Sequence, residues 1–129
     1  MILVDSSVWI EFFRRDSDLD LEASLDLEEV VTCLPVIQEV LQGFDDQRTY
    51  LLAREAMFAF PVVESPLSDE VHLQAVDLYR AARRAGLTVR SSVDCLIGAC
   101  ALRNSLTVAH HDRDFDALAK VSPLEVHRI

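Results

Sequence analysis

Four acidic residues that lie far apart in the chain are each expected at the same edge of a sheet: Asp5, Glu39, Asp94 and Asp112. Two like charges about 4 Å apart repel by about 4 kcal/mol at an effective dielectric constant of 20, so a cluster of four would raise a pKa or recruit a cation. Carboxylate oxygens are hard ligands that select Mg²⁺ or Mn²⁺ over zinc. Such an ion activates water and stabilises charge on phosphate, which is the chemistry of phosphodiester hydrolysis.

Each acid also has a purely structural explanation. Asp5 could cap the helix that starts near Ser7, Asp112 could cap the turn into residues 115–118, and the helix dipole favours an acid such as Asp94 in a first turn. Glu39 could lie on a helix flank that faces water. For one acid alone the structural explanation is the more common one, but it accounts less well for all four together.

The elements that must position these acids alternate between short apolar strands and helices. Strands are expected at residues 2–4, 30–34, 62–63, 106–109 and 124–127, and helices at 8–13, within 19–29, from Pro35, at 47–60, from Ser68 to Gly86, and at 93–103 after a cap at Ser91 or Ser92. This order predicts an α/β fold with a parallel sheet covered on both faces. Ligands of such sheets bind beyond the carboxyl ends of the strands, where the four acids are expected.

Length and composition predict one globular domain spanning residues 1–129. Half of the 129 residues are apolar and 26% are charged, which excludes a disordered chain. Three cysteines without C-x-x-C spacing argue against a disulfide framework or a zinc site and suit reduced thiols. No apolar run reaches the roughly 18 residues of a membrane span, and no basic segment precedes Asp5 as in a signal peptide. We therefore expect a cytoplasmic protein with no membrane partner.

The net charge of −10 is unevenly distributed. Ten acids and no lysine or arginine lie between Asp16 and Asp46, so the rest of the chain is neutral. The segment 80–93 carries arginines and no acid, and eleven of the twelve bases are arginine, which suits bidentate phosphate contacts. A solvated helix face explains this segment equally well, but the net acidity does not exclude an RNA partner.

Four sequence segments resemble the signatures of the PIN-domain ribonucleases, and most closely those of the VapC toxins of VapBC toxin–antitoxin pairs. The segments are Val4-Asp5-Ser6-Ser7-Val8-Trp9-Ile10, Pro35-Val36-Ile37-Gln38-Glu39-Val40-Leu41-Gln42-Gly43, Arg90-Ser91-Ser92-Val93-Asp94-Cys95-Leu96-Ile97-Gly98-Ala99-Cys100-Ala101 and His111-Asp112-Arg113-Asp114-Phe115. Their order and spacing extend over nearly the whole chain. The residues Arg103-Asn104-Ser105 depart from the family, which usually has a glycine before the late strand, and this puts the geometry of that turn in doubt.

The resemblance implies a three-layer α/β/α sandwich with a short, mostly parallel sheet. It also implies an endoribonuclease that uses Mg²⁺ or Mn²⁺ to cleave structured RNA such as tRNA or rRNA. The implied partners are a second copy of the chain and a VapB-type antitoxin, in a higher assembly. On this resemblance the acidic quartet is Asp5, Glu39, Asp94 and Asp112, with Ser7 and Asp114 in supporting positions.

In the mechanism that we expect, Asp5 and Asp94 bind the principal ion and Asp112 completes its shell, directly or through water. Glu39 positions or deprotonates the water that displaces the 3′ oxygen. Arg90 and Arg113 are candidates for binding the RNA backbone, with Arg83 and Arg84 as further candidates, although an ion pair with a nearby aspartate explains Arg113 at least as well.

Several other side chains are ambiguous. His110 and His111 adjoin Asp112, but hard cations rarely take imidazole and adjacent residues of an extended segment point to opposite faces. Aromatic residues near the N-terminus suit a core or a dimer surface better than base stacking, and a groove for an antitoxin peptide is as plausible as simple core around the helix after Gln47. These aromatic residues are Trp9, Phe12, Phe13, Tyr50, Phe58 and Phe60.

Three other classes of protein compete with the nuclease. A catalytically weak PIN-like module that binds RNA or a protein would not need all four acids. A phospho-acceptor receiver domain needs paired acids after the first strand and a strand-end lysine, whereas Ser6 follows Asp5 and Lys120 lies elsewhere. A phosphatase with an aspartate nucleophile needs an Asp-x-Asp pair where this chain has Asp5-Ser6-Ser7.

Overall fold

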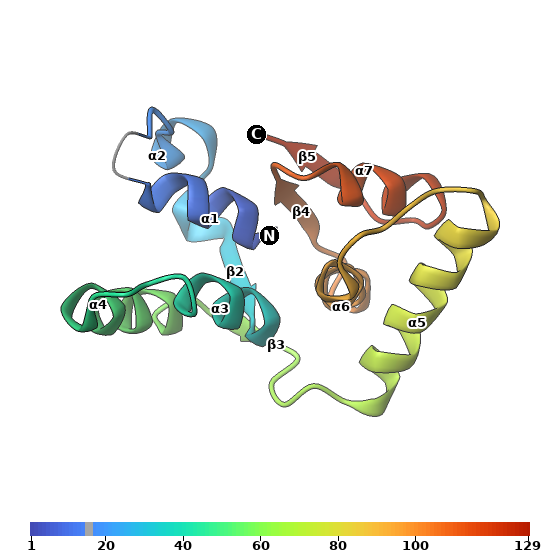
Figure 1. Ribbon diagram of the computed structural model, residues 1–129, viewed down its shortest axis with the longest axis horizontal. Coiled ribbons are helices and arrows are strands. Elements are labelled where there is room, and N and C mark those ends of the chain that lie inside the picture. The colour runs from blue at the N-terminus through green and yellow to red at the C-terminus, as the bar shows by residue number, and fades with distance from the viewer. Residues whose placement is uncertain (15–16) are drawn as a thin grey trace.

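The computed structural model describes residues 1–14 and 17–129, and its centre is a five-stranded sheet in which every paired strand is parallel (Figure 1). The strand order is β3-β2-β1-β4-β5. The strands are β1 (Ile2–Val4), β2 (Val30–Cys33), β3 (Val62–Val63), β4 (Thr107–His110) and β5 (Val126–Arg128). Helices flank the sheet, so the predicted α/β/α architecture is confirmed.

The predicted helices occur in the expected order with a few differences in their bounds, and a further helix that was not predicted follows β4. They are α1 (Ser6–Phe13), α2 (Leu21–Ser24), the 3₁₀ turn η1 (Leu27–Glu29), α3 (Leu34–Leu41), α4 (Gln47–Phe58), α5 (Asp69–Arg84), α6 (Ser92–Arg103) and α7 (Arg113–Lys120). The helix expected within 19–29 is divided into α2 and η1, because Asp20 and Asp26 each cap a separate short turn. The last two strands begin one or two residues later than predicted, and Leu124 lies in the core instead of in β5.

Three helices begin at the carboxyl ends of the central strands. Asp5 is the N-cap of α1 after β1, Cys33 occupies the N-cap position of α3 after β2, and Asp112 is the N-cap of α7 after β4. Since β1, β2 and β4 are adjacent in the sheet, the first turns of α1, α3 and α7 meet at one edge. The sheet topology therefore brings the acids of these turns together.

Helix α6 supplies the remaining acid and packs closely against its neighbours. Its segment from Ile97 to Ala101 is buried, and a Cβ atom at Gly98 would lie 3.4 Å from both Leu78 Cδ1 and Leu118 Cδ1. Ser91 occupies the N-cap position of α6 but forms no side-chain capping bond within the described structure, whereas Ser68 caps α5 as predicted. Small residues thus let α6 approach both α5 and α7.

The turn before β4 contains no glycine, and Ser105 takes its place in the left-handed region with φ 53°. This conformation is unfavourable for a residue with a Cβ atom, which explains why a glycine is common there. The departure noted in the sequence is therefore accommodated by local backbone strain.

The hydrophobic core lies on both faces of the sheet. The three central strands are almost wholly buried, and all three cysteines are buried free thiols in this structure, as expected. None of the helices in the described ranges combines the length and the hydropathy that a bilayer crossing requires.

Candidate metal centre

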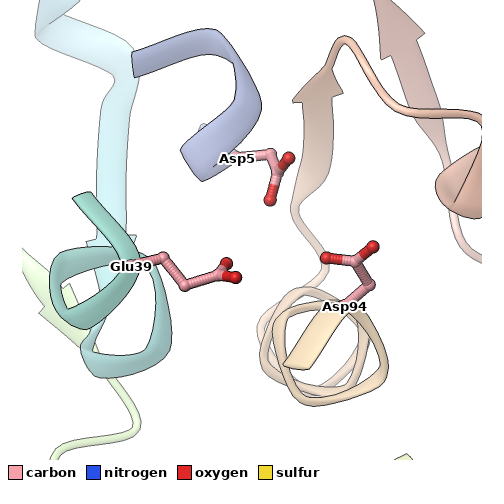
Figure 2. Close-up of side chains that lie close together, drawn as sticks. All are labelled: Asp5, Glu39 and Asp94. Carbon is pink, nitrogen blue, oxygen red and sulfur yellow. The ribbon is translucent and has the colours of Figure 1, made fainter. Parts of the chain in front are cut away.

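Two groups of three carboxylates share Asp94 at the carboxyl edge of the sheet. In the first, oxygens of Asp5, Glu39 and Asp94 all lie within 4.8 Å of one another. Figure 2 shows these three side chains pointing from α1, α3 and α6 toward a common space. In the second, oxygens of Asp94, Asp112 and Asp114 meet within the same distance.

Asp5 uses only one of its two carboxylate oxygens to cap α1. Its Oδ2 accepts hydrogen bonds from the Ser7 backbone N–H at 3.0 Å and from the Ser7 hydroxyl. Its Oδ1 is buried and has no hydrogen-bond partner among the described residues. Burial raises the pKa of Asp5 to about 6, against the lowering effect of the Ser7 hydrogen bonds. One oxygen of Asp5 thus remains available to a ligand.

Asp94 is buried in the first turn of α6, where it faces the other acids. Its Oδ2 likewise lacks a partner in residues 1–14 and 17–129. Burial, followed by the negative charge of Asp5, raises the pKa of Asp94 to about 9. A carboxylate in this position is stable only with a proton or a cation beside it.

Glu39 is held in place by α1. Its Oε1 accepts a hydrogen bond of 2.8 Å from the Ser6 hydroxyl, which joins α3 to the first turn of α1 across 33 residues of sequence. The sequence analysis did not identify Ser6 as a site residue. No spacing rule could have revealed it, since the contact depends on the packing of α1 against α3.

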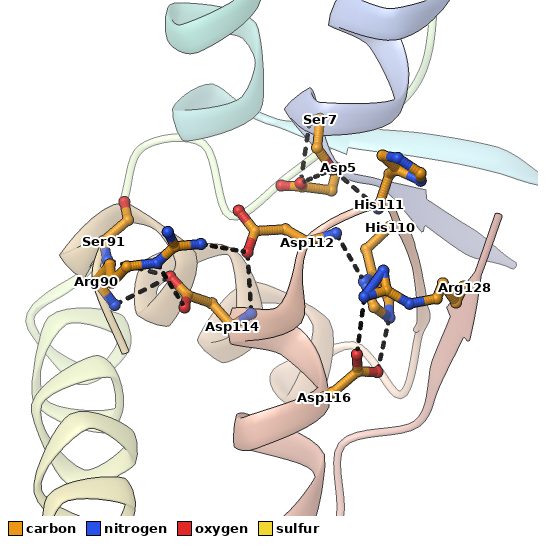
Figure 3. Close-up of polar contacts among 10 residues, drawn as sticks. All are labelled: Asp5, Ser7, Arg90, Ser91, His110, His111, Asp112, Asp114, Asp116 and Arg128. Carbon is orange, nitrogen blue, oxygen red and sulfur yellow. Dashed lines mark hydrogen bonds and ion pairs between the residues drawn. The ribbon is translucent and has the colours of Figure 1, made fainter. Parts of the chain in front are cut away.

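In the second group, the loop before α6 binds one oxygen of Asp114, whereas the buried Oδ1 has no hydrogen-bond partner among the described residues. Its Oδ2 accepts hydrogen bonds from the backbone N–H groups of Arg90 and Ser91, at 3.1 and 3.2 Å (Figure 3). The Arg90 guanidinium lies 3.8 Å from an oxygen of Asp112 and from one of Asp114. Asp114 therefore fixes the entry to α6, and with it the position of Asp94.

Ser7 connects the ends of β1 and β4. Its hydroxyl donates to Asp5 and accepts a hydrogen bond of 3.0 Å from the His111 backbone N–H. Asp112 in the same turn caps α7 by accepting from the Asp114 N–H at 2.9 Å. One serine thereby fixes the distance between two of the strand ends that carry acids.

These residues fit a hard divalent cation. The donors are all oxygens, and three buried carboxylate oxygens, Asp5 Oδ1, Asp94 Oδ2 and Asp114 Oδ1, have no hydrogen-bond partner in the described structure. Buried polar atoms without partners are rare and call for a ligand. Burial is the main reason why the pKa values of Asp5 and Asp94 are raised, and a bound cation would lower them by favouring the charged carboxylates.

The residues proposed for the site from the sequence largely gather here. The four acids lie at one edge of the sheet with Ser7 and Asp114. They form two groups that share Asp94: one also contains Asp5 and Glu39, and the other contains Asp112 and Asp114. Arg90 is half-exposed beside the acids. Three other candidate arginines are exposed: Arg83 and Arg84 at the end of α5, and Arg113, which lies between Asp112 and Asp114 at the start of α7.

The two histidines before Asp112 point to opposite faces, as predicted. His110 is fully buried and His111 is exposed. Burial lowers the pKa of His110, which favours a neutral ring.

Residues 2–121 match the PIN domain. The chain is 37% identical over 131 aligned residues to Ribonuclease VapC11 of Mycobacterium tuberculosis (strain ATCC 25618 / H37Rv) and to VapC ribonuclease Mb1587 of Mycobacterium bovis, with 97% of this chain and 96% of each relative covered. Its fold is similar to that of FitAcB from Neisseria gonorrhoeae, with a TM-score of 0.74 at 22% identity over 98% of this chain and 96% of that chain. It is also similar to VapBC-5 from Mycobacterium tuberculosis, with a TM-score of 0.74 at 23% identity over 98% and 97%. The chain therefore belongs to the PIN-domain family and, within it, to the VapC ribonucleases.

Proposed function

We propose that this chain is the toxin of a type II toxin–antitoxin pair, an endoribonuclease that uses Mg²⁺ or Mn²⁺ to hydrolyse phosphodiester bonds in structured RNA such as tRNA or rRNA. The observation that carries the proposal is that Asp5 and Asp94, which belong to one group of acids, each have a buried oxygen without a hydrogen-bond partner among the described residues. The names of the relatives, VapC ribonucleases, support the same class of reaction.

In this proposal Asp5 and Asp94 hold the principal ion with Glu39 beside it, and Asp112, which groups with Asp94, completes the shell directly or through water. A bound Mg²⁺ or Mn²⁺ stabilises charge on the phosphate and lowers the pKa of water. Glu39 is oriented by Ser6 through one oxygen, and its other oxygen receives the proton of the attacking water as the 3′ oxygen leaves. Asp114 and Ser7 act by holding Arg90–Ser91 and His111 in place.

The proposed substrate and partners rest on the arginines of the chain and on the structures similar to it. Arg113 and Arg90, with Arg83 and Arg84, suit contacts with the RNA backbone, because guanidinium groups bind phosphate in a bidentate way. Similar structures include VapBC-1 from Haemophilus influenzae and a toxin–antitoxin complex from Klebsiella pneumoniae. We propose a VapB-type antitoxin as partner, a homodimer of 129-residue nuclease domains, and a cytoplasmic location.

Cleavage of total RNA by the purified protein tests this function. We expect Mn²⁺-dependent cleavage by the wild type and a decrease of more than about a hundredfold in D5N and D94N, since each loses a proposed ion ligand. D77N, which changes an exposed acid of α5, serves as the matched control and should retain full activity. Undiminished Mn²⁺-dependent cleavage by D94N would contradict the proposal.

The same assay separates the nuclease from its main rival, a PIN-like module that binds without cleaving. Such a module would bind RNA or a protein in a gel-shift assay and leave every RNA intact at all concentrations of Mn²⁺. A small reading frame directly upstream that encodes a DNA-binding antitoxin would support the toxin assignment independently.

A further inference from the structure

His110 is a fully buried polar residue at the end of β4, two residues before Asp112. Its ring packs beside Phe115 of α7, with the ring centroids 5.5 Å apart. Its Nδ1 accepts a hydrogen bond of 3.2 Å from the backbone N–H of Asp112 (Figure 3). The side chain thus reaches forward to the residue whose carboxylate faces Asp94.

The other ring nitrogen is directed at the first turns of α7. Since Nδ1 acts as an acceptor, the neutral ring carries its proton on Nε2. Nε2 lies 3.4 Å from Asp116 Oδ1, although it forms no hydrogen bond with a described residue. The other oxygen of Asp116 lies 3.4 Å from the Arg128 guanidinium of β5. The His110 ring therefore lies between the backbone of Asp112 and the carboxylate of Asp116, which pairs with Arg128 of β5.

Three backbone groups of this turn have specific hydrogen-bond partners. The His110 carbonyl accepts from the Ile129 N–H at 2.9 Å, and the His111 N–H donates to Ser7. The Asp112 N–H is the next donor along the chain, and the His110 ring is its acceptor. Replacing the His110 ring by an apolar group would remove the acceptor of the Asp112 N–H. The backbone of Asp112 would then rotate to find another partner, and its carboxylate would move with it.

We propose that His110 is a positioning residue, which holds the backbone of Asp112 so that its carboxylate faces Asp94 in the orientation that ion binding requires. The inference rests on the proposed function, because it gives His110 the role of orienting Asp112, an acid of the proposed ion site. Partners that orient ion ligands typically change ion affinity or activity by 10- to 100-fold when they are removed. A ring that merely fills space would have no such effect once its volume is restored.

Three substitutions distinguish positioning from packing. H110F keeps the ring volume and its contact with Phe115 but removes both nitrogens. H110N places an amide oxygen near the Nδ1 position, where it can accept from Asp112. H110Q carries its amide to the region of Nε2 and leaves the Asp112 N–H without its acceptor. H127F, at an exposed histidine of β5, is the matched control.

The measurement is Mn²⁺ affinity, followed by the electron paramagnetic resonance of free Mn²⁺, alongside the melting temperature and cleavage of a model RNA. We expect H110F and H110Q to weaken Mn²⁺ binding by about tenfold, and H110N to remain within about threefold of the wild type. H127F should match the wild type. Rescue by H110N but not by H110Q supports positioning, even where all three variants melt at a similarly lowered temperature.

Equal Mn²⁺ affinity in H110N and H110Q would overturn the inference, as would wild-type affinity in H110F. Failure of the proposed function gives a different result. In that case the wild type itself would neither bind Mn²⁺ nor cleave RNA, and D94N would be indistinguishable from it.

Discussion

At the scale of single residues, the acids of the site have a structural and a chemical role at once. Asp5 caps α1 with one oxygen and leaves the other buried without a partner in the described structure, and Asp112 caps α7 while it faces Asp94. The capping explanation considered for each acid from the sequence is therefore correct for both residues, and it does not compete with ion binding. A cap fixes the rotamer of the carboxylate, which prepares the remaining oxygen for a ligand.

The raised pKa of Asp94 predicts how stability depends on pH. Because its pKa is about 9 in the folded protein and 3.8 in an ordinary environment, folding takes up a proton above about pH 4. The free energy of unfolding of the ion-free protein should therefore fall as the pH rises from 5 to 8, with Asp5 contributing up to its pKa of about 6.

D94N carries no charge at any pH and lacks this contribution. In the absence of divalent ions, we expect it to melt several degrees above the wild type at pH 8, with a smaller difference at pH 5. Addition of Mn²⁺ should stabilise the wild type and leave D94N nearly unchanged. If the difference in melting temperature between D94N and the wild type were the same at pH 5 and pH 8, the pKa of Asp94 would not be raised in the ion-free protein.

At the scale of the elements, the fold could be predicted because strands and helices have clear local signals. The apolar run before Asp5, Pro35 at the start of α3 and Ser68 before α5 each specify an element boundary. The division into α2 and η1 was missed, because Asp20 and Asp26 fit either a helix surface or a cap.

What the local signals do not contain is the packing between elements. The Ser6–Glu39 bond and the contacts of Arg90 with Asp112 and Asp114 each depend on how two segments approach each other. The gathering of the acids was predictable from the parallel topology. Their division into two groups that share Asp94 was not.

The close packing of α6 leads to a prediction for Gly98. A Cβ atom there would make ordinary van der Waals contacts at 3.4 Å with two leucine side chains, so alanine fits. We expect G98A to raise the free energy of unfolding by about 0.5–1 kcal/mol through helix propensity. G98L should lower it by about 1–3 kcal/mol, because three helices meet at this point. Urea denaturation measures both, and destabilisation by G98A would refute this account of the packing.

At the scale of the whole molecule, charge is segregated along the chain. The net charge is −10, yet the acids concentrate before residue 47 and exposed arginines occur at the end of α5. An acidic protein can still bind RNA when its positive side chains are gathered near the site, because contacts with phosphate are local at physiological ionic strength.

Substitution of these arginines tests the path of the RNA. The double variant R83A/R84A should raise the KM for RNA severalfold, leave kcat unchanged, and reduce the slope of log K against log salt by about 1–2. R48A changes an exposed arginine of α4 and is the matched control. An unchanged salt slope in the double variant would show that the RNA does not follow α5.

The central claim is that folding creates one site for a hard divalent ion between α1, α3 and α6, and the most direct measurement is anomalous scattering from crystals grown with Mn²⁺. The account predicts a manganese peak within coordinating distance of Asp5 Oδ1 and Asp94 Oδ2, and loss of that peak in D94N crystals grown under the same conditions. An anomalous map without manganese between these two carboxylates, at an ion concentration that supports cleavage, would contradict it.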